Sequence, residues 1–140
     1  MGPRIIVHDL KHAQAALTAA AELGLPVTLV SAPGAAASLG AAVFREIVAE
    51  SHREVPGVVV TAILDCGDDA GLALNALRRG LGVIRLRSSP AVMAAVADIA
   101  NQLGAVLDPD PEAPALDLLD RQDALEASRS WLLNDLAEPD

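Results

Sequence analysis

An uninterrupted apolar run at residues 58–64, followed at once by the polar sequence at residues 65–69, constrains the fold more than any other stretch of this chain. Seven residues are too few to span a membrane, and the run is too continuous for a strand with one face in water. It predicts a central strand of a parallel sheet, covered on both faces. A helical pattern follows, and ligands of open parallel sheets bind beyond the carboxyl ends of the strands.

Strands and helices alternate along residues 1–107 with short connections, a pattern that is typical of parallel sheets with right-handed crossovers. Further strands are predicted at 4–8, 27–31, 83–87 and 105–107, and helices at 11–23, 36–53, about 72–79 and 90–103. The expected fold is therefore a small five-stranded parallel sheet in a flavodoxin- or Rossmann-like three-layer βα repeat.

The last part of the chain has a different character. Residues 108–114 contain three prolines and read as a stiff acidic linker. Beyond it, Leu118, Leu125 and Leu132 recur every seven residues and predict an amphipathic helix over 115–136. We thus expect an α/β domain at 1–107, a linker at 108–114 and a C-terminal helix and tail at 115–140. The helix can pack on its own chain or on a second copy, and we expect a homodimer.

Charge and composition exclude several classes of protein. The net charge is −9, and residues 108–140 hold ten Asp or Glu against two Arg. An acidic tail and an aromatic content of 1% argue against nucleic-acid binding. No apolar segment suits a membrane helix or a signal peptide, and a single cysteine fits a reducing compartment, so we expect a cytoplasmic protein. Zinc-ligand spacings and nucleotide-binding motifs are absent, and no cofactor is indicated.

Asp65 is the first candidate for chemistry, because a carboxylate at the end of a buried strand is costly unless it has a partner. It can act as a general base or bind a cation. Cys66 and Gly67 follow it, and the thiol can serve as a nucleophile or simply fill an apolar niche. Asp68 and Asp69 can equally cap the next helix.

His8 and Asp9 end the first predicted strand. In a flavodoxin-like strand order, 2-1-3-4-5, the first and third strands are neighbours, which would bring both residues beside Asp65. Such a cluster could transfer protons or hold a divalent cation. The alternative is that Asp9 caps the first helix and His8 is half-buried.

Two loops combine hydroxyl groups with a helix N-terminus, where anions are stabilised. One runs from Ser31 to Gly34. The other contains Arg87, Ser88 and Ser89, and its guanidinium suits bidentate binding of phosphate or carboxylate. Arg85 and Arg87 alternate along one strand, so that either this strand lies near an edge or the arginines reach into the crevice.

The segment from Asp65 to Gly80, with its Ala-Leu-x-x-Gly ending (residues 76–80) and the strand after it, resembles a βαβ unit of phosphate-binding (β/α)8 barrels such as aldolases. The resemblance covers about thirty residues and transfers no catalytic residue. Lys11 is the only lysine and lies on a predicted helix, so no Schiff-base lysine is indicated. Five βα units are also too few for a closed barrel.

Three functions remain open from the sequence. The first is binding of a small anionic ligand, phosphorylated or carboxylated, at the carboxyl edge of the sheet. The second is an enzyme acting on such a metabolite, with Asp65 and His8 as acid and base. The third is an interaction module without chemistry that uses the acidic C-terminal helix.

Overall fold

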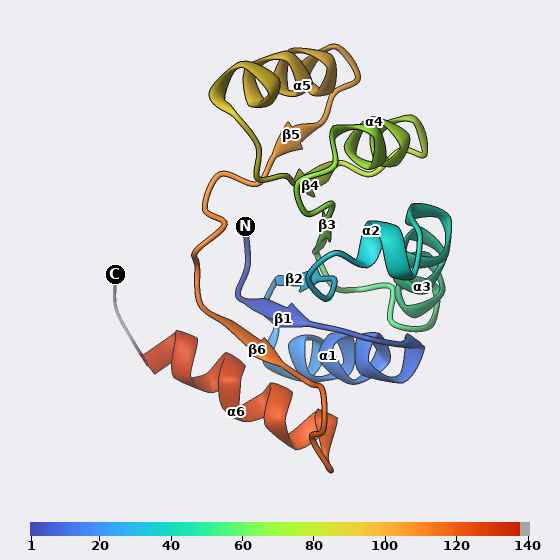
Figure 1. The fold of residues 1–140 in the computed structure, drawn as a ribbon. Coiled ribbons are helices and arrows are strands. Elements are labelled where there is room, and N and C mark those ends of the chain that lie inside the picture. Colours follow the sequence, from blue (N-terminus) through green and yellow to red (C-terminus); the bar gives the residue numbers. More distant parts are fainter. Residues whose placement is uncertain (138–140) are drawn as a thin grey trace. The chain divides into compact units, whose positions relative to one another are not determined.

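The computed structural model describes residues 1–137 and contains a parallel sheet of six strands, together with six helices. The strands are β1 (Arg4–Ile6), β2 (Val27–Val30), β3 (Val60–Asp65), β4 (Val83–Arg85), β5 (Val106–Leu107) and β6 (Ala115–Asp117). The helices are α1 (Leu10–Leu23), α2 (Ala35–Ser38), α3 (Ala41–Glu54), α4 (Ala70–Arg78), α5 (Pro90–Gln102) and α6 (Ala124–Ala137), as Figure 1 shows. The predicted α/β class with a parallel sheet is confirmed, with six strands in place of five.

The order of the strands differs from the flavodoxin-like expectation. Hydrogen-bonded neighbours follow the order β5-β4-β3-β2-β1-β6, so β2, not β1, is the neighbour of β3. From β1 to β5 each new strand is added on the same side of the one before it. The expected pairing of β1 with β3 is therefore wrong, because β1 pairs with β2 and β6.

The chain divides into two compact units. The first unit comprises Met1–Val30, Ile47–Thr61 and the described part of Pro114–Asp140. The second unit comprises Ser31–Glu46 and Ala62–Ala113. Each has its own buried side chains, among them Ile5 and Leu17 in the first unit and Phe44 and Ile84 in the second.

In the first unit, β1 lies between β2 and β6, with Ile5 opposite Leu29 on one side and Leu116 on the other. Helix α1 begins where the Asp9 carboxylate accepts a hydrogen bond from the His12 amide, and it ends at Gly24 in the left-handed region (φ 66°). Its alanine-rich face lets α6 pack closely against it (Figure 1).

The C-terminal segment is the main correction to the predicted elements. The helix expected over 115–136 begins only at Ala124, because Ala115–Asp117 form β6. Leu118 and Leu132 are fully buried, and Arg129 binds both carboxylate oxygens of Glu22 on α1 at 2.7 and 2.9 Å. The helix therefore packs on its own chain. Among residues 1–137 no helix is long and apolar enough to cross a bilayer.

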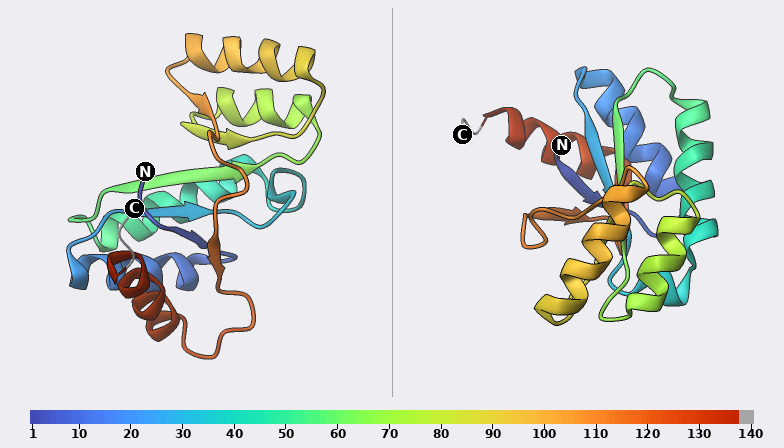
Figure 2. Two further views of the ribbon diagram at one scale, coloured as in Figure 1. Left: turned by 90° about the vertical axis from the view of Figure 1, so that its left-hand side faces the viewer. Right: turned by 90° about the horizontal axis from the view of Figure 1, so that it is seen from above.

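In the second unit, β4 lies between β3 and β5, and α4 and α5 lie side by side (Figure 2). Small side chains at Ala73 and Ala76 are fully buried on α4 and allow this close packing. Helix α5 begins as the sequence predicts, with Ser89 as N-cap and Pro90 in the first turn.

Strand β3 is central, but it is covered on both faces only in its second half. Val59, predicted to lie inside the strand, is 72% exposed, and β3 starts at Val60. Residues Ile63, Leu64 and Asp65 are buried. The apolar run therefore brings a carboxylate, Asp65, to the end of a buried strand.

Two further predicted elements have different bounds. The helix expected over 36–53 is divided into α2 and α3 at Gly40, whose φ of 93° ends the first short helix. The strand expected over 83–87 ends at Arg85. Arg87 consequently lies in the loop between β4 and α5.

Candidate functional site

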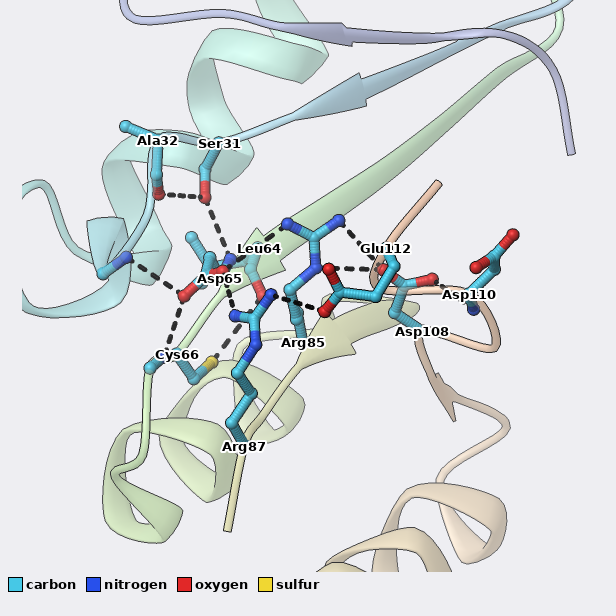
Figure 3. A network of polar contacts seen from close by, with 12 residues as sticks. Ser31, Ala32, Leu64, Asp65, Cys66, Arg85, Arg87, Asp108, Asp110 and Glu112 are labelled. Carbon is cyan, nitrogen blue, oxygen red and sulfur yellow. Dashed lines mark hydrogen bonds and ion pairs between the residues drawn. The ribbon is translucent and has the colours of Figure 1, made fainter. Parts of the chain in front are cut away.

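Four loops of the second unit meet around Asp65, and each follows the carboxyl end of a strand. They are the loops after β2, β3, β4 and β5, and they contribute Gly34, Gly67, Arg87 and Asp108 to one polar network. Figure 3 shows its charged members, Asp65, Arg87 and Asp108, near one another. The Arg87 amide donates to the Gly67 carbonyl at 2.8 Å, which ties two of these loops together. Charged side chains thus gather at the carboxyl edge of these strands.

The Asp65 carboxylate is the centre of the network, and its residue is 2% exposed. Its Oδ1 accepts hydrogen bonds from the amides of Gly34 at 3.0 Å and Gly67 at 2.8 Å. Its Oδ2 faces Nη1 of Arg85 at 3.6 Å and Nη1 of Arg87 at 3.5 Å. Four donors therefore surround this buried anion, which leaves little of its lone-pair capacity for a substrate proton.

Gly34 and Gly67 both adopt positive φ, at 69° and 60°, and this conformation turns each amide toward Asp65. A side chain at either position would be strained in the left-handed region, although open space surrounds both. The two glycines predicted as ligand-binding residues thus bind an anion, but the anion is the protein's own Asp65.

Ser31 is also part of this network, and its contacts are with other residues of the protein. Its hydroxyl accepts from the Asp65 amide at 2.9 Å and donates to the carbonyl of Ala32 at 3.1 Å. The residue is buried. Both functions of this hydroxyl are used to hold the end of β3 against the loop after β2.

Arg85 is fixed by a second buried carboxylate. Its Nε and Nη2 both lie 3.0 Å from Oδ2 of Asp108, and both side chains are largely buried. Asp108 in turn accepts from the amide of Asp110 at 3.0 Å. The first residue of the predicted linker is therefore part of the site.

Arg87 is held far more loosely than Arg85. Its side chain is 53% exposed, 3.5 Å from Asp65 and 3.7 Å from Oε1 of Glu112. Its Nε–H has no partner among residues 1–137. Ser88 and Ser89 beside it are exposed, and the Ser89 hydroxyl accepts from the Val92 amide at 3.3 Å. This guanidinium is the cation of the network that can bind an external anion.

The Cys66 thiol does not suit a nucleophile. Burial, with the nearby charges of Asp65 and Asp69, raises its pKa to about 12. The sulfur faces the Leu64 carbonyl at 3.8 Å. The thiol stays protonated at neutral pH, and its residue is buried.

His8 belongs to a separate cluster in the first unit. Because β1 pairs with β2 and β6, the strand arrangement that would bring His8 and Asp9 beside Asp65 is not formed. The His8 Nε2 lies 2.7 Å from Oδ1 of Asp117, the last residue of β6. Asp9 caps α1 through the amide of His12.

Further contacts fix the geometry of this histidine pair. Nδ1 of His12 accepts a hydrogen bond from the His8 amide at 3.1 Å, and the two rings meet edge to face. Partial burial raises the pKa of Asp117, but hydrogen bonds from Leu119 and His8, with the charges of His8 and His12, outweigh it and lower the pKa. Among the described residues, no group of three or more His, Cys, Asp or Glu is arranged to hold a metal ion.

Three carboxylates of these clusters were missed as site residues by the sequence interpretation. They are Asp108, Glu112 and Asp117. All three lie in segments predicted as linker or helix, where carboxylates are ordinarily solvated. The usable signal was the alternation of Arg85 and Arg87, since two arginines at the end of a covered strand need anionic partners.

Comparisons with known proteins show the fold and no more. No family model and no curated protein matches the sequence. Among solved structures, one that matches is a putative fructose-1,6-biphosphate aldolase from Coccidioides immitis, with a TM-score of 0.60 and 20% identity. The match covers 75% of this chain and 44% of that chain. The protein is therefore an α/β protein with a parallel sheet. Its fold is similar to part of this aldolase structure, and the sequence of residues 65–87 also resembles a βαβ unit of aldolases.

Proposed function

We propose that this protein binds a small oxyanion, a phosphorylated or carboxylated metabolite, at Arg87 in the loop between β4 and α5. The observation that carries the proposal is the contrast between the two arginines. Arg85 is held by two contacts of 3.0 Å to Asp108, whereas Arg87 is half-exposed with contacts of 3.5 and 3.7 Å. A planar guanidinium with unused donors suits the two oxygens of a phosphate or carboxylate.

The surroundings of Arg87 support the same ligand class. Ser88 and Ser89 are exposed and lie at the N-terminus of α5, where the helix dipole favours an anion. Asp65 contributes as an internal anion that orients Arg87, in place of the acid–base role considered for it. The similar aldolase is named for a bisphosphorylated sugar, which makes phosphorylated metabolites the first ligands to test.

Thermal unfolding with inorganic phosphate tests this proposal. A ligand that binds only the folded state raises the melting temperature. The rise grows with the logarithm of the ligand concentration once that concentration exceeds the dissociation constant. We expect phosphate to raise the melting temperature of the wild type, and Arg87→Ala to abolish the gain. Arg45→Ala, which removes the same charge from an exposed position in the second unit, is the control. An equal gain in Arg87→Ala contradicts the proposal.

A second candidate function is proton transfer by His8. Asp117 accepts a hydrogen bond from Nε2, which leaves Nδ1 as the basic nitrogen. No partner among residues 1–137 contacts Nδ1, and it is not among the buried unpaired atoms. A base at Nδ1 that removes an acidic C–H proton from a bound metabolite would let that proton exchange with deuterium in deuterium oxide. Exchange that persists in His8→Gln rules out this role.

The remaining expectations stay predictions. The acidic C-terminal helix could still mediate association, because Leu119 and Leu133 are exposed although Leu118 and Leu132 are buried. We propose a homodimer and a cytoplasmic location on the sequence arguments alone, and light scattering of the purified chain tests the first.

A further inference from the structure

Glu112 contacts Arg87, the residue to which the proposed function assigns the ligand. Its Oε1 is 3.7 Å from Nη2 of Arg87, and its side chain is 85% exposed. Figure 3 shows Arg87 between Asp65 and Glu112, each at a different nitrogen of the guanidinium. The outer edge of Arg87 therefore already faces a carboxylate that belongs to the same chain.

The position of Glu112 follows from the way its loop is anchored. Asp108 is locked on Arg85 and accepts the amide of Asp110, and the amide of Ala113 donates to the carbonyl of Asp110 at 3.1 Å. This turn places Glu112 four residues after a buried anchor. Glu112 itself is held by a single long contact and can leave without disturbing the anchor.

We propose that Glu112 is an internal competitor for the oxyanion site, so that a ligand must displace its carboxylate from Arg87 in order to bind. The inference rests on the proposed function of Arg87. A carboxylate or phosphate group of a ligand is negatively charged like the Glu112 carboxylate and also binds through oxygen atoms. It can therefore replace Glu112 in the contact with Arg87. The fraction of molecules in which Glu112 has left Arg87 is then the fraction that can bind the ligand.

The expected strength of this competition is small but measurable. Exposed ion pairs are weak, and a site that is blocked for part of the time loses apparent affinity in proportion to the blocked fraction. We expect Glu112→Gln to tighten binding of inorganic phosphate roughly two- to fivefold. A glutamine side chain keeps the size of the residue and removes the charge that binds the guanidinium.

Asp110→Asn provides a matched control. Asp110 lies on the same exposed turn, and the described contacts of this residue use its backbone rather than its side chain. This variant therefore removes the same charge from nearly the same place without freeing Arg87. We expect it to change the affinity less than Glu112→Gln does.

The experiment is a titration of the full chain with phosphate, and in parallel with acetate, followed in nuclear magnetic resonance spectra by the backbone amide resonances of Ser88 and Ser89, which every variant retains. Tighter binding in Glu112→Gln than in Asp110→Asn, and no effect of Glu112→Gln in an Arg87→Ala background, is the expected result. Equal gains in the two single variants, or none in Glu112→Gln, overturn the inference. Wild-type affinity in Arg87→Ala overturns the proposed function itself, so the two failures are distinguishable.

Discussion

Replacing Asp65 tests whether one buried carboxylate organises the loops of the second unit. In Asp65→Ala the amides of Gly34 and Gly67 lose their acceptor. Both hydrogen bonds are part-buried, so water can partly replace the lost acceptor, and the two together predict a loss of about 1–3 kcal/mol in the free energy of unfolding. Arg85 keeps its two contacts to Asp108, which limits the further cost of the lost charge.

Asp65→Asn separates the hydrogen bonds from the charge. Its amide oxygen can still accept from Gly34 and Gly67, so only the attraction of the two guanidiniums is lost. We expect a cost of about 1.5–3 kcal/mol, the range for hydrogen bonds to charged groups. Asp65→Ala should therefore be less stable than Asp65→Asn by at least about 1 kcal/mol.

Urea unfolding measures these differences, provided that the slope of the transition is unchanged. Amide hydrogen exchange gives a local reading, because the amides of Gly34 and Gly67 should exchange faster in Asp65→Ala than in Asp65→Asn. Asp68→Ala, an exposed carboxylate three residues away, should change stability by no more than about 0.5 kcal/mol. Equal stability of the two Asp65 variants, or unchanged exchange at both glycines, would refute the assignment of Asp65 as an internal anion.

Three further predictions follow from the other clusters. Iodoacetamide should label Cys66 only as fast as the protein opens, because the pKa of about 12 leaves almost no thiolate at pH 8; fast labelling of the folded protein contradicts this. The lowered pKa of Asp117 stabilises the fold above the unfolded-state pKa, near 3.8, and this stabilisation is lost as pH falls through the folded-state value. Asp117→Asn should thus lower the melting temperature at neutral pH and weaken its fall at acidic pH. A melting temperature with an unchanged pH dependence excludes the pairing with His8. Removal of residues 114–140 should uncover β1 and α1 and cause aggregation or a lower melting temperature, and equal solubility and melting would show that Leu132 contributes nothing.

Helix ends could be predicted because the residues that form them act locally. Asp9, Asp69 and Ser89 each accept a hydrogen bond from an amide three residues later, and Gly24 adopts the left-handed conformation that ends α1. These interactions depend on a few neighbouring residues, which the sequence displays directly.

Strand order could not be predicted in the same way. Nothing in residues 4–8 states whether β1 pairs with β3 or with β6, since both pairings bury the same apolar side chains. Strand β6 has only three residues, and Leu118 directly after it continues the seven-residue spacing of Leu125 and Leu132, which favoured a helix. The misplaced helix concealed Asp117, and with it the actual partner of His8.

The structure brings several of the predicted site residues together, among them Asp65, Gly67 and Arg87, but their internal pairing could not be predicted. The carboxyl end of β3 and the arginines of the following strand were recognisable, because charged residues beside an apolar run mark a strand end. The partners Asp108 and Glu112 were not, because a proline-rich acidic segment looks the same whether it is solvated or anchored. Only the contact with Arg85 distinguishes the two cases.

The pairing of β6 with β1 has a consequence for the order in which the protein folds during synthesis. The strands of the second unit, residues 62–107, leave the ribosome as one continuous segment, and their pairing closes short loops. The first unit must wait, because β1 and α1 are made before the strands of the second unit, whereas their partners β6 and α6 come after residue 114. Until then one edge of β1 presents unpaired backbone groups to other chains. A chaperone that covers this edge of β1 during synthesis should therefore raise the yield of folded protein.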